Sequence, residues 1–309
     1  MHAVLLKSQS LTVERPDRAT GTAIGAVGSI GALLLAALLF AKAVDWPVSW
    51  PQFLAYLGTA ALILLACLFA FWSYCCASLR YTLDPGAITV IWGPIRHVIS
   101  LSNIQGLSHG RGEQRPRIRG LGWRGYHIGQ GYVDEFGDVL FFSTHRAPDD
   151  LVYVQTAGTT YGLSPRDPAR FVAEAQRRRQ AGQDQSRDAV QRHLIAAHPI
   201  WADRTAQALA FVAVVVNAAL WAFLFAYYPD LNSEITIEFP PIGEIANIHA
   251  RGEIFKIPAT ATAILAVNLA ASLFFQWRER AAAYLLLSGT IFFQALFAAA
   301  AAVAIINAT

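Results

Sequence analysis

Five long apolar runs constrain the fold of this chain more than any other feature. They cover residues 22–43, 53–76, 206–228, 257–276 and 284–306, and none of them contains Asp, Glu or Arg. Each is close to the ~20 residues that a helix needs to cross about 30 Å of hydrocarbon. Only 15% of the chain is charged, against about 25% in a typical soluble protein. The sequence therefore predicts an α-helical membrane protein with five transmembrane helices.

The basic residues between the runs predict how the chain is oriented. Segment 79–204 has sixteen Arg, whereas loop 44–52 has no Lys or Arg and loop 229–256 has two basic residues against five acidic ones. Loops on the cytoplasmic side carry the excess of Lys and Arg. We therefore expect the N-terminus and the central segment on the cytoplasmic side of the membrane, and the C-terminus outside.

Two alternatives to this membrane topology are less favoured. Ala-Lys-Ala at 41–43 resembles a signal-peptide cleavage site, but the long leader and long apolar core favour a retained first helix. A transport pathway normally needs ionisable groups within the membrane. The runs carry neutral polar residues instead, such as Asn217 and Gln294, which hydrogen bonding between helices would explain.

Short alternating segments replace the apolar pattern after Leu79. "RYTL" and "AITVIW" flank Asp84, Pro85 and Gly86, and this turn predicts a hairpin. In "LSNIQGLS" (101–108) the apolar residues recur every third position, which favours a strand with a bulge. About seven antiparallel strands in about 85 residues would form a small sandwich or barrel.

A helix is expected to close this module. Asp167 is placed as its N-cap with Pro168 at the first helical position, and Phe171, Val172 and Ala175 share one face. Arg177, Arg178 and Arg179 fall in the last turn, where cations meet the negative end of the helix dipole. Helix capping accounts for these arginines, and contact with anionic lipid is the alternative.

Residues 79–180 resemble the bacterial pleckstrin-homology-like (PH-like) domains that are embedded in membrane proteins. The Asp-Pro-Gly hairpin, the "Leu-x-x-Ile-x-x-Leu" segment and the ending "Tyr-x-Leu-Ser-Pro-x-Asp-Pro-x-x-Phe" carry this resemblance. It implies a cytoplasmic α+β module of about seven antiparallel strands capped by a C-terminal helix. It does not imply phosphoinositide binding.

Residues 225–306 resemble, more weakly, the small membrane module found in SdpI-like immunity proteins. Phe239 and Gly243 fit the spacing of its extracytoplasmic loop, while Glu238 stands where a His is common. The expected organisation is a cytoplasmic leader (1–21), a transmembrane hairpin (22–78), the PH-like domain (79–180), a linker (181–205), and three transmembrane helices with an extracytoplasmic loop at 229–256 (206–309). The linker is expected as an amphipathic connector or a short helix.

No set of residues in the sequence has the spacing of a catalytic, cofactor-binding or metal-binding site. The six histidines of the central segment form no HxxxH or Cys/His group, and Cys67, Cys75 and Cys76 form no CxxC pair. We therefore predict a non-enzymatic protein with no cofactor, no metal and no nucleic-acid partner.

Arginines between the expected strands form the best candidate site. Five of them fall within 111–124, namely Arg111, Arg115, Arg117, Arg119 and Arg124. Basic groups near an anionic membrane surface each contribute about 1 kcal/mol to binding. The alternative is that they only reflect the basic bias of cytoplasmic loops. With Arg177, Arg178 and Arg179, they are the predicted contacts to anionic headgroups or a partner.

Two functions follow from these features. In the first, the PH-like domain binds or scaffolds an unknown protein partner, or contacts the anionic membrane surface. In the second, the protein is a sensor or immunity-type protein that uses the acidic loop 229–256.

Overall fold

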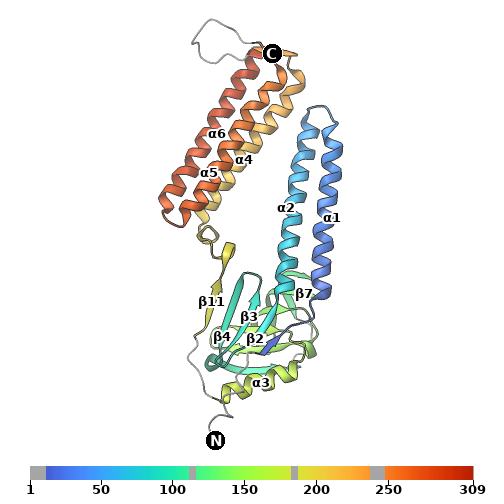
Figure 1. Cartoon of the computed structure of the whole chain (residues 1–309), viewed down its shortest axis with the longest axis vertical. Coiled ribbons are helices and arrows are strands. Elements are labelled where there is room, and N and C mark those ends of the chain that lie inside the picture. The colour runs from blue at the N-terminus through green and yellow to red at the C-terminus, as the bar shows by residue number, and fades with distance from the viewer. Residues whose placement is uncertain (1–11, 111–115, 182–186, 237–247, 309) are drawn as a thin grey trace, which may run out of the picture. The chain divides into compact units, whose positions relative to one another are not determined.

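The computed structural model describes residues 12–110, 116–181, 187–236 and 248–308 (Figure 1). The chain divides into two compact units. The first comprises Met1–Leu33 and Ile63–Ala196, and the second comprises Leu34–Leu62 and Ala197–Thr309. Each unit is described by itself.

All five apolar runs are long helices. Their bounds are α1 Ala19–Val44, α2 Trp50–Ser78, α4 Arg204–Tyr227, α5 Lys256–Gln276 and α6 Arg280–Ala308. Within the described residues, these five helices are long and apolar enough to cross a membrane. The prediction of five such helices is confirmed, and the chain is a multi-pass membrane protein by these criteria.

Two β-sheets form the central module of the first unit. The five-stranded sheet has the order β1-β2-β3-β4-β11, and the six-stranded sheet has the order β5-β9-β10-β8-β7-β6. The helix α3 (Pro168–Gln180) runs across one end of the strands. The strands are β1 Thr12–Glu14, β2 Arg80–Leu83, β3 Ala87–Trp92, β4 Ile95–Ser100, β5 Ile104–His109, β6 Arg117–Trp123, β7 Tyr126–Val133, β8 Gly137–Ser143, β9 Val152–Thr156, β10 Thr160–Leu163 and β11 Ala189–Arg192.

The local signals in the sequence are confirmed where they predict turns and caps. Strands β2 and β3 pair around the Asp84 turn, where the Asp84 N–H donates to the Ala87 carbonyl at 2.9 Å. The pairing of β5 shifts register after Ile104, as a bulge requires. The Asp167 carboxylate caps α3 by accepting the Arg170 N–H at 3.0 Å.

The predicted count of about seven antiparallel strands is wrong in two respects. Among the described residues, nine strands lie between Arg80 and Leu163. Residues 117–122 belong to the segment 110–122 that was expected as a loop, but they form strand β6 with Trp123, because pairing with β7 outweighs their low intrinsic strand preference. In addition, β10 lies parallel to β8 while it pairs antiparallel with β9.

Segments outside the module complete its first sheet. Strand β1 of the leader pairs with β2, and β11 of the expected linker pairs with β4. From residue 187 on, the linker contains a strand followed by 3₁₀ turns at 194–197 and 199–202, where an amphipathic connector or a short helix was expected. The Asp188 carboxylate fixes the start of β11 by accepting the Ser100 N–H at 2.6 Å.

The two sheets share one buried core, and Tyr81 connects them. Its side chain on β2 is fully buried. The hydroxyl donates to the Phe142 carbonyl of β8 at 2.6 Å and accepts the Ser164 N–H at 3.2 Å. Burial raises the pKa of Tyr81 to about 12, so the hydroxyl remains a neutral donor.

Side-chain amides hold the helices α4, α5 and α6 of the second unit together. The Asn217 amide donates to the Gln294 side-chain oxygen at 3.0 Å, and the Gln294 amide donates to the Ala261 carbonyl at 2.8 Å. Thr262 donates to Asn217 at 3.1 Å and accepts the Trp221 indole N–H at 2.9 Å. Hydrogen bonding between helices thus accounts for these polar residues, as predicted.

Asp203 closes one end of the same three helices. Its carboxylate caps α4 through the Ala206 N–H at 3.0 Å, and accepts Gln276 of α5 at 2.6 Å and Tyr284 of α6 at 2.7 Å. These hydrogen bonds, Tyr284 foremost, lower the pKa of Asp203. One ionised group therefore connects all three helices.

Candidate functional site

The turn between β6 and β7 packs against α1 and α2 at the ends of these helices that meet the central module. The indole N–H of Trp123 donates to the Gly21 carbonyl in the first turn of α1 at 2.8 Å. The same ring lies 6.1 Å, between centroids, from the rings of Phe69 and Trp72 on α2. Trp123 therefore contacts both helices of the hairpin.

Glycines make this contact possible because the backbones of α1 and of the β6–β7 turn approach each other very closely. A Cβ on Gly21 would lie 2.2 Å from the carbonyl oxygen of Gly125, closer than any real Cβ contact. Gly125 itself has φ +84°, a conformation that favours glycine. No larger residue fits at Gly21 unless the turn moves away from α1.

The turn between β3 and β4 makes a second close contact with α2. The Gly93 N–H donates to the Ser78 hydroxyl at 2.7 Å, and a Cβ on Gly93 would lie 2.5 Å from the Cys75 sulfur. Trp92 beside it donates to the Tyr126 hydroxyl at 2.8 Å, which connects the two turns. Burial raises the pKa of Tyr126, so its hydroxyl stays protonated.

Helices α1 and α2 are themselves packed closely near the module. A Cβ on Gly25 would lie 3.0 Å from that of Ser73, and one on Gly28 would lie 3.0 Å from the Phe69 ring. The Ser73 hydroxyl donates to the Thr22 carbonyl at 2.9 Å. The parts of α1 and α2 that belong to the first unit thus pack continuously with the module.

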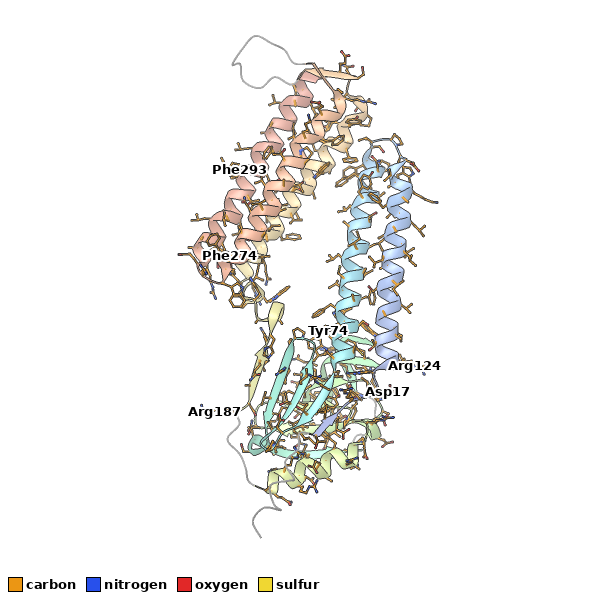
Figure 2. The ribbon with its side chains drawn as sticks, viewed as in Figure 1. Asp17, Tyr74, Arg124, Arg187, Phe274 and Phe293 are labelled. Atoms are coloured by element: carbon orange, nitrogen blue, oxygen red, sulfur yellow. The ribbon has the colours of Figure 1, made fainter. Side chains whose placement is uncertain are left out.

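Three of the five predicted loop arginines lie on the β6–β7 hairpin. Arg124 is in the turn, beside the start of α1 (Figure 2), and is exposed. Arg117 and Arg119 are exposed on β6. The other two, Arg111 and Arg115, lie outside the described residues. The sequence predicts one loop for all five, but Arg117 and Arg119 lie on strand β6 and Arg124 lies in the turn after it.

Arg117 and Arg119 form an exposed strip with residues of the neighbouring strand. In the ladder, Arg117 is opposite Tyr132 and Arg119 is opposite Gln130, so all four side chains share one face. Tyr132 is 62% exposed, and Gln130 is also exposed. We call Arg117, Arg119, Gln130 and Tyr132 the β6–β7 strip. Neither Gln130 nor Tyr132 was singled out from the sequence, because their partnership depends on strand register.

Comparison with protein families identifies the module. Residues 79–179 match the family model of the bacterial PH domain. The module is a bacterial PH-like domain. No curated protein and no solved structure matched the chain. The comparisons do not show the weaker resemblance of 225–306 to the SdpI-like module.

The arginine triplet at the end of the PH-like domain is divided by the fold. Arg178 points inward and donates to Glu174 at 2.8 Å, to Thr12 of β1 at 2.7 Å and to the Leu83 carbonyl. Arg177 is exposed and paired with Glu174. Arg179 is exposed. Arg178 therefore holds α3 against the first sheet, and only Arg177 and Arg179 face solvent.

The buried histidine of the PH-like domain is neutral and structural. His127 is 8% exposed and accepts a hydrogen bond from the Arg146 guanidinium at 3.1 Å. Burial, with Arg146 and His145 nearby, lowers the pKa of His127 to about 4. Within the described residues, no group of three or more His, Cys, Asp or Glu could hold a metal ion.

The described parts of loop 229–256 include two short strands that pair antiparallel. Strand β12 (Glu234–Thr236) pairs with β13 (Ile248–Ala250). The Arg251 guanidinium lies 5.0 Å from the centroid of the Tyr228 ring, a distance typical of a cation–π contact. Glu238, Phe239 and Gly243, which carried the SdpI-like resemblance, lie outside the described residues.

Proposed function

We propose that this chain is a non-enzymatic scaffold that holds a PH-like domain in a fixed orientation beside the membrane. The seating of two glycine turns on the α1–α2 hairpin carries this proposal. A domain that only had to stay near the membrane would need no more than a linker. Here the close contacts of Gly125 with Gly21 and of Gly93 with Cys75 would fix its rotation and height. A fixed orientation is useful for presenting one face to a partner.

The β6–β7 strip is the face we assign to that partner. The turn end of this hairpin is occupied by the membrane helices through Trp123, so the partner's contact falls at the other end, on Arg117, Arg119 and Tyr132. Exposed Arg and Tyr are enriched at protein interfaces. Two guanidinium groups beside a phenol would suit an acidic segment of a protein partner.

The excess of Arg in 79–204 supports a cytoplasmic position for this domain, with the C-terminus on the other side of a bacterial cytoplasmic membrane. Arg124 would then lie at the level of the lipid headgroups, because it follows Trp123 in the turn seated on α1. The proposal thus assigns Arg124 to the membrane surface, and Arg117 and Arg119 to the partner.

A photocrosslinking experiment on the full chain in cells tests this assignment. A photoreactive amino acid at Tyr132 should give a discrete protein adduct that is lost in the Arg117→Glu/Arg119→Glu variant. The matched control is Arg170→Glu/Arg179→Glu on α3, which changes the charge equally and should keep the adduct. Adducts with lipid alone, or adducts that persist in the strip variant, would contradict the proposal.

A further inference from the structure

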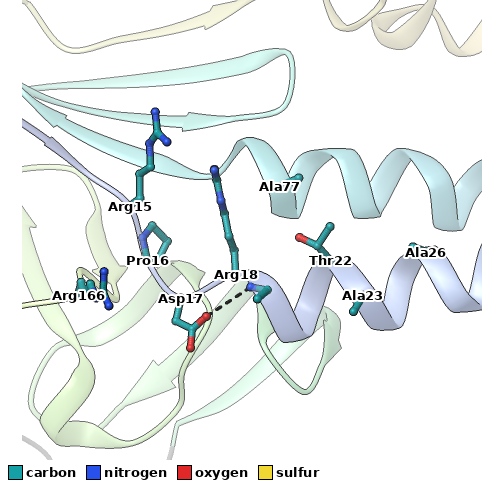
Figure 3. A pocket seen from close by; sticks show the side chains of 10 residues that line it. Arg15, Pro16, Asp17, Arg18, Thr22, Ala23, Ala26, Ala77 and Arg166 are labelled. Carbon is teal, nitrogen blue, oxygen red and sulfur yellow. Dashed lines mark hydrogen bonds between the residues drawn. The ribbon is translucent and has the colours of Figure 1, made fainter.

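A groove lined by three arginines lies at the N-terminal end of α1, apart from the β6–β7 strip. This open groove has a volume of about 680 Å³ and lies between the segment that follows β1, the first turns of α1, the last turn of α2 and the segment before α3. Arg15, Arg18 and Arg166 line it together with a single carboxylate, that of Asp17 (Figure 3). The lining thus contains three guanidinium groups and one carboxylate.

The guanidinium groups of this groove have few interaction partners among the described residues. Arg15 and Arg166 are exposed, and within the described residues neither side chain has a hydrogen-bond or ion-pair partner. Arg18 makes one long hydrogen bond, of 3.4 Å, to the Leu79 carbonyl. Asp17 accepts the Ala19 N–H at 3.4 Å. The positive end of the α1 dipole adds to the attraction for an anion.

Apart from Thr22, the rest of the lining is apolar, and most of it belongs to helices that are long and apolar enough to cross a membrane. Ala23 and Ala26 of α1 and Ala77 of α2 line the groove beside the arginines. The groove therefore combines a cationic end with an apolar side that continues along α1. That combination matches a phospholipid, with its phosphate among the arginines and its acyl chain beside the alanines, better than it matches a free anion.

We propose that this groove binds the phosphate headgroup of an anionic phospholipid. The bound phosphate would connect Arg166 of the PH-like domain to Arg15 and Arg18 of the leader. It would thereby reinforce the seating of the domain on α1 and α2. This site does not depend on the protein partner proposed for the β6–β7 strip, and its failure would leave that proposal intact.

Native mass spectrometry of the full chain in detergent tests the site. The probes are phosphatidylglycerol, phosphatidylcholine and inorganic phosphate. We expect phosphatidylglycerol to be retained in preference to phosphatidylcholine. The Arg15→Ala/Arg166→Ala variant should weaken its binding roughly five-fold for each arginine removed. The matched control, Arg170→Ala/Arg179→Ala, should bind like the parent.

Several outcomes would overturn the proposal. These are equal retention of both lipids, unchanged binding by the double variant, and equal weakening by the control. Displacement of the lipid by millimolar inorganic phosphate would indicate a free-anion site instead of a lipid site. If the double variant does not fold, Arg166→Ala alone gives the same test, because Arg166 is exposed and supports no other described contact.

Discussion

The α1–α2 hairpin and the α4–α6 bundle are both made of apolar helices, yet they are held together differently. In the hairpin, the backbones approach at glycines, with a Cβ on Gly25 only 3.0 Å from that of Ser73. In the bundle, side-chain amides make the contacts, with Asn217 and Gln294 bonded at 3.0 Å and both buried. Close packing of small residues and interhelical hydrogen bonding are the two common ways to associate helices in a membrane.

This difference indicates separate roles for the glycine contacts of the hairpin and the polar contacts of the bundle. The glycine surface of α1 extends to Gly21, where α1 contacts both Cys76 of α2 and the Gly125 turn of the PH-like domain. The polar groups of the bundle are satisfied by one another, and Asp203 closes its end. The hairpin is therefore built to receive another domain, whereas the polar contacts of the bundle are directed at its own three helices.

Gly21→Ala should give the largest effect, because the new Cβ would overlap the Gly125 carbonyl. We expect the PH-like domain to lose about 3 kcal/mol of stability, or its contact with α1. Amide hydrogen exchange of the β6–β7 turn in nanodiscs measures this loss. The matched control is Gly31→Ala on the same helix, where a Cβ meets no atom within 4 Å. Equal rates of amide hydrogen exchange in the two variants would contradict the role given to Gly21.

Arg178→Ala should cost the PH-like domain about 2 kcal/mol, because the Leu83 carbonyl, Thr12 and Glu174 would lose a charged donor. Thermal unfolding of the full chain measures it. Arg179→Ala, one residue further on and exposed, should change the stability by less than about 0.5 kcal/mol. Similar losses from both substitutions would show that Arg178 is not the group that holds α3.

The stability of the PH-like domain should fall with acidification through His127. Its pKa is lowered from 6.5 to about 4, so its contribution is complete above about pH 6.5 and is lost as the pH falls from there toward 4. We expect a loss on the order of 1.5 kcal/mol between pH 7 and 5. Unfolding by denaturant at the two pH values measures it. His127→Gln should flatten this part of the dependence, and an unchanged pH profile would exclude His127 as its source.

Gln294→Leu tests the hydrogen bonds of the α4–α6 bundle and should give the smallest effect. It leaves the Asn217 amide and the Ala261 carbonyl without this partner, at a cost of about 1 kcal/mol in a membrane. Unfolding of the bundle in mixed detergent micelles measures the change. Phe292→Ala, at a position that is 62% exposed on α6, is the control for loss of volume. A larger effect from Phe292 would mean that the amides do not hold the bundle together.

Local sequence signals predicted the parts of the fold that depend on nearby residues. The five apolar runs, the Asp84 turn, the bulge near Ile104 and the Asp167 cap each rest on a short stretch of chain, and each is confirmed. Pairings between distant segments were missed. Strand β6 is rich in Arg and Gly, and β1 and β11 are only three and four residues long, so tertiary pairing decides them and not propensity.

The candidate site was predicted only in part for the same reason. Its arginines were visible as a cluster, but strand register decides that Arg119 lies opposite Gln130. The roles of Gly21 and Gly125 depend on contact between segments about one hundred residues apart, and a glycine in an apolar run gives no sign of this. Arg15 and Arg166 come together only through the fold.

The central claim is that the PH-like domain is held in one orientation against the ends of α1 and α2. Distance measurement between two spin labels in nanodiscs tests it most directly. The labels would be placed at Ile24→Cys on α1 and Tyr132→Cys on β7, both exposed, with the exposed Cys67 replaced by Ala. We predict a single narrow distance distribution that becomes broad in Gly21→Ala. A broad distribution in the parent protein would contradict the claim.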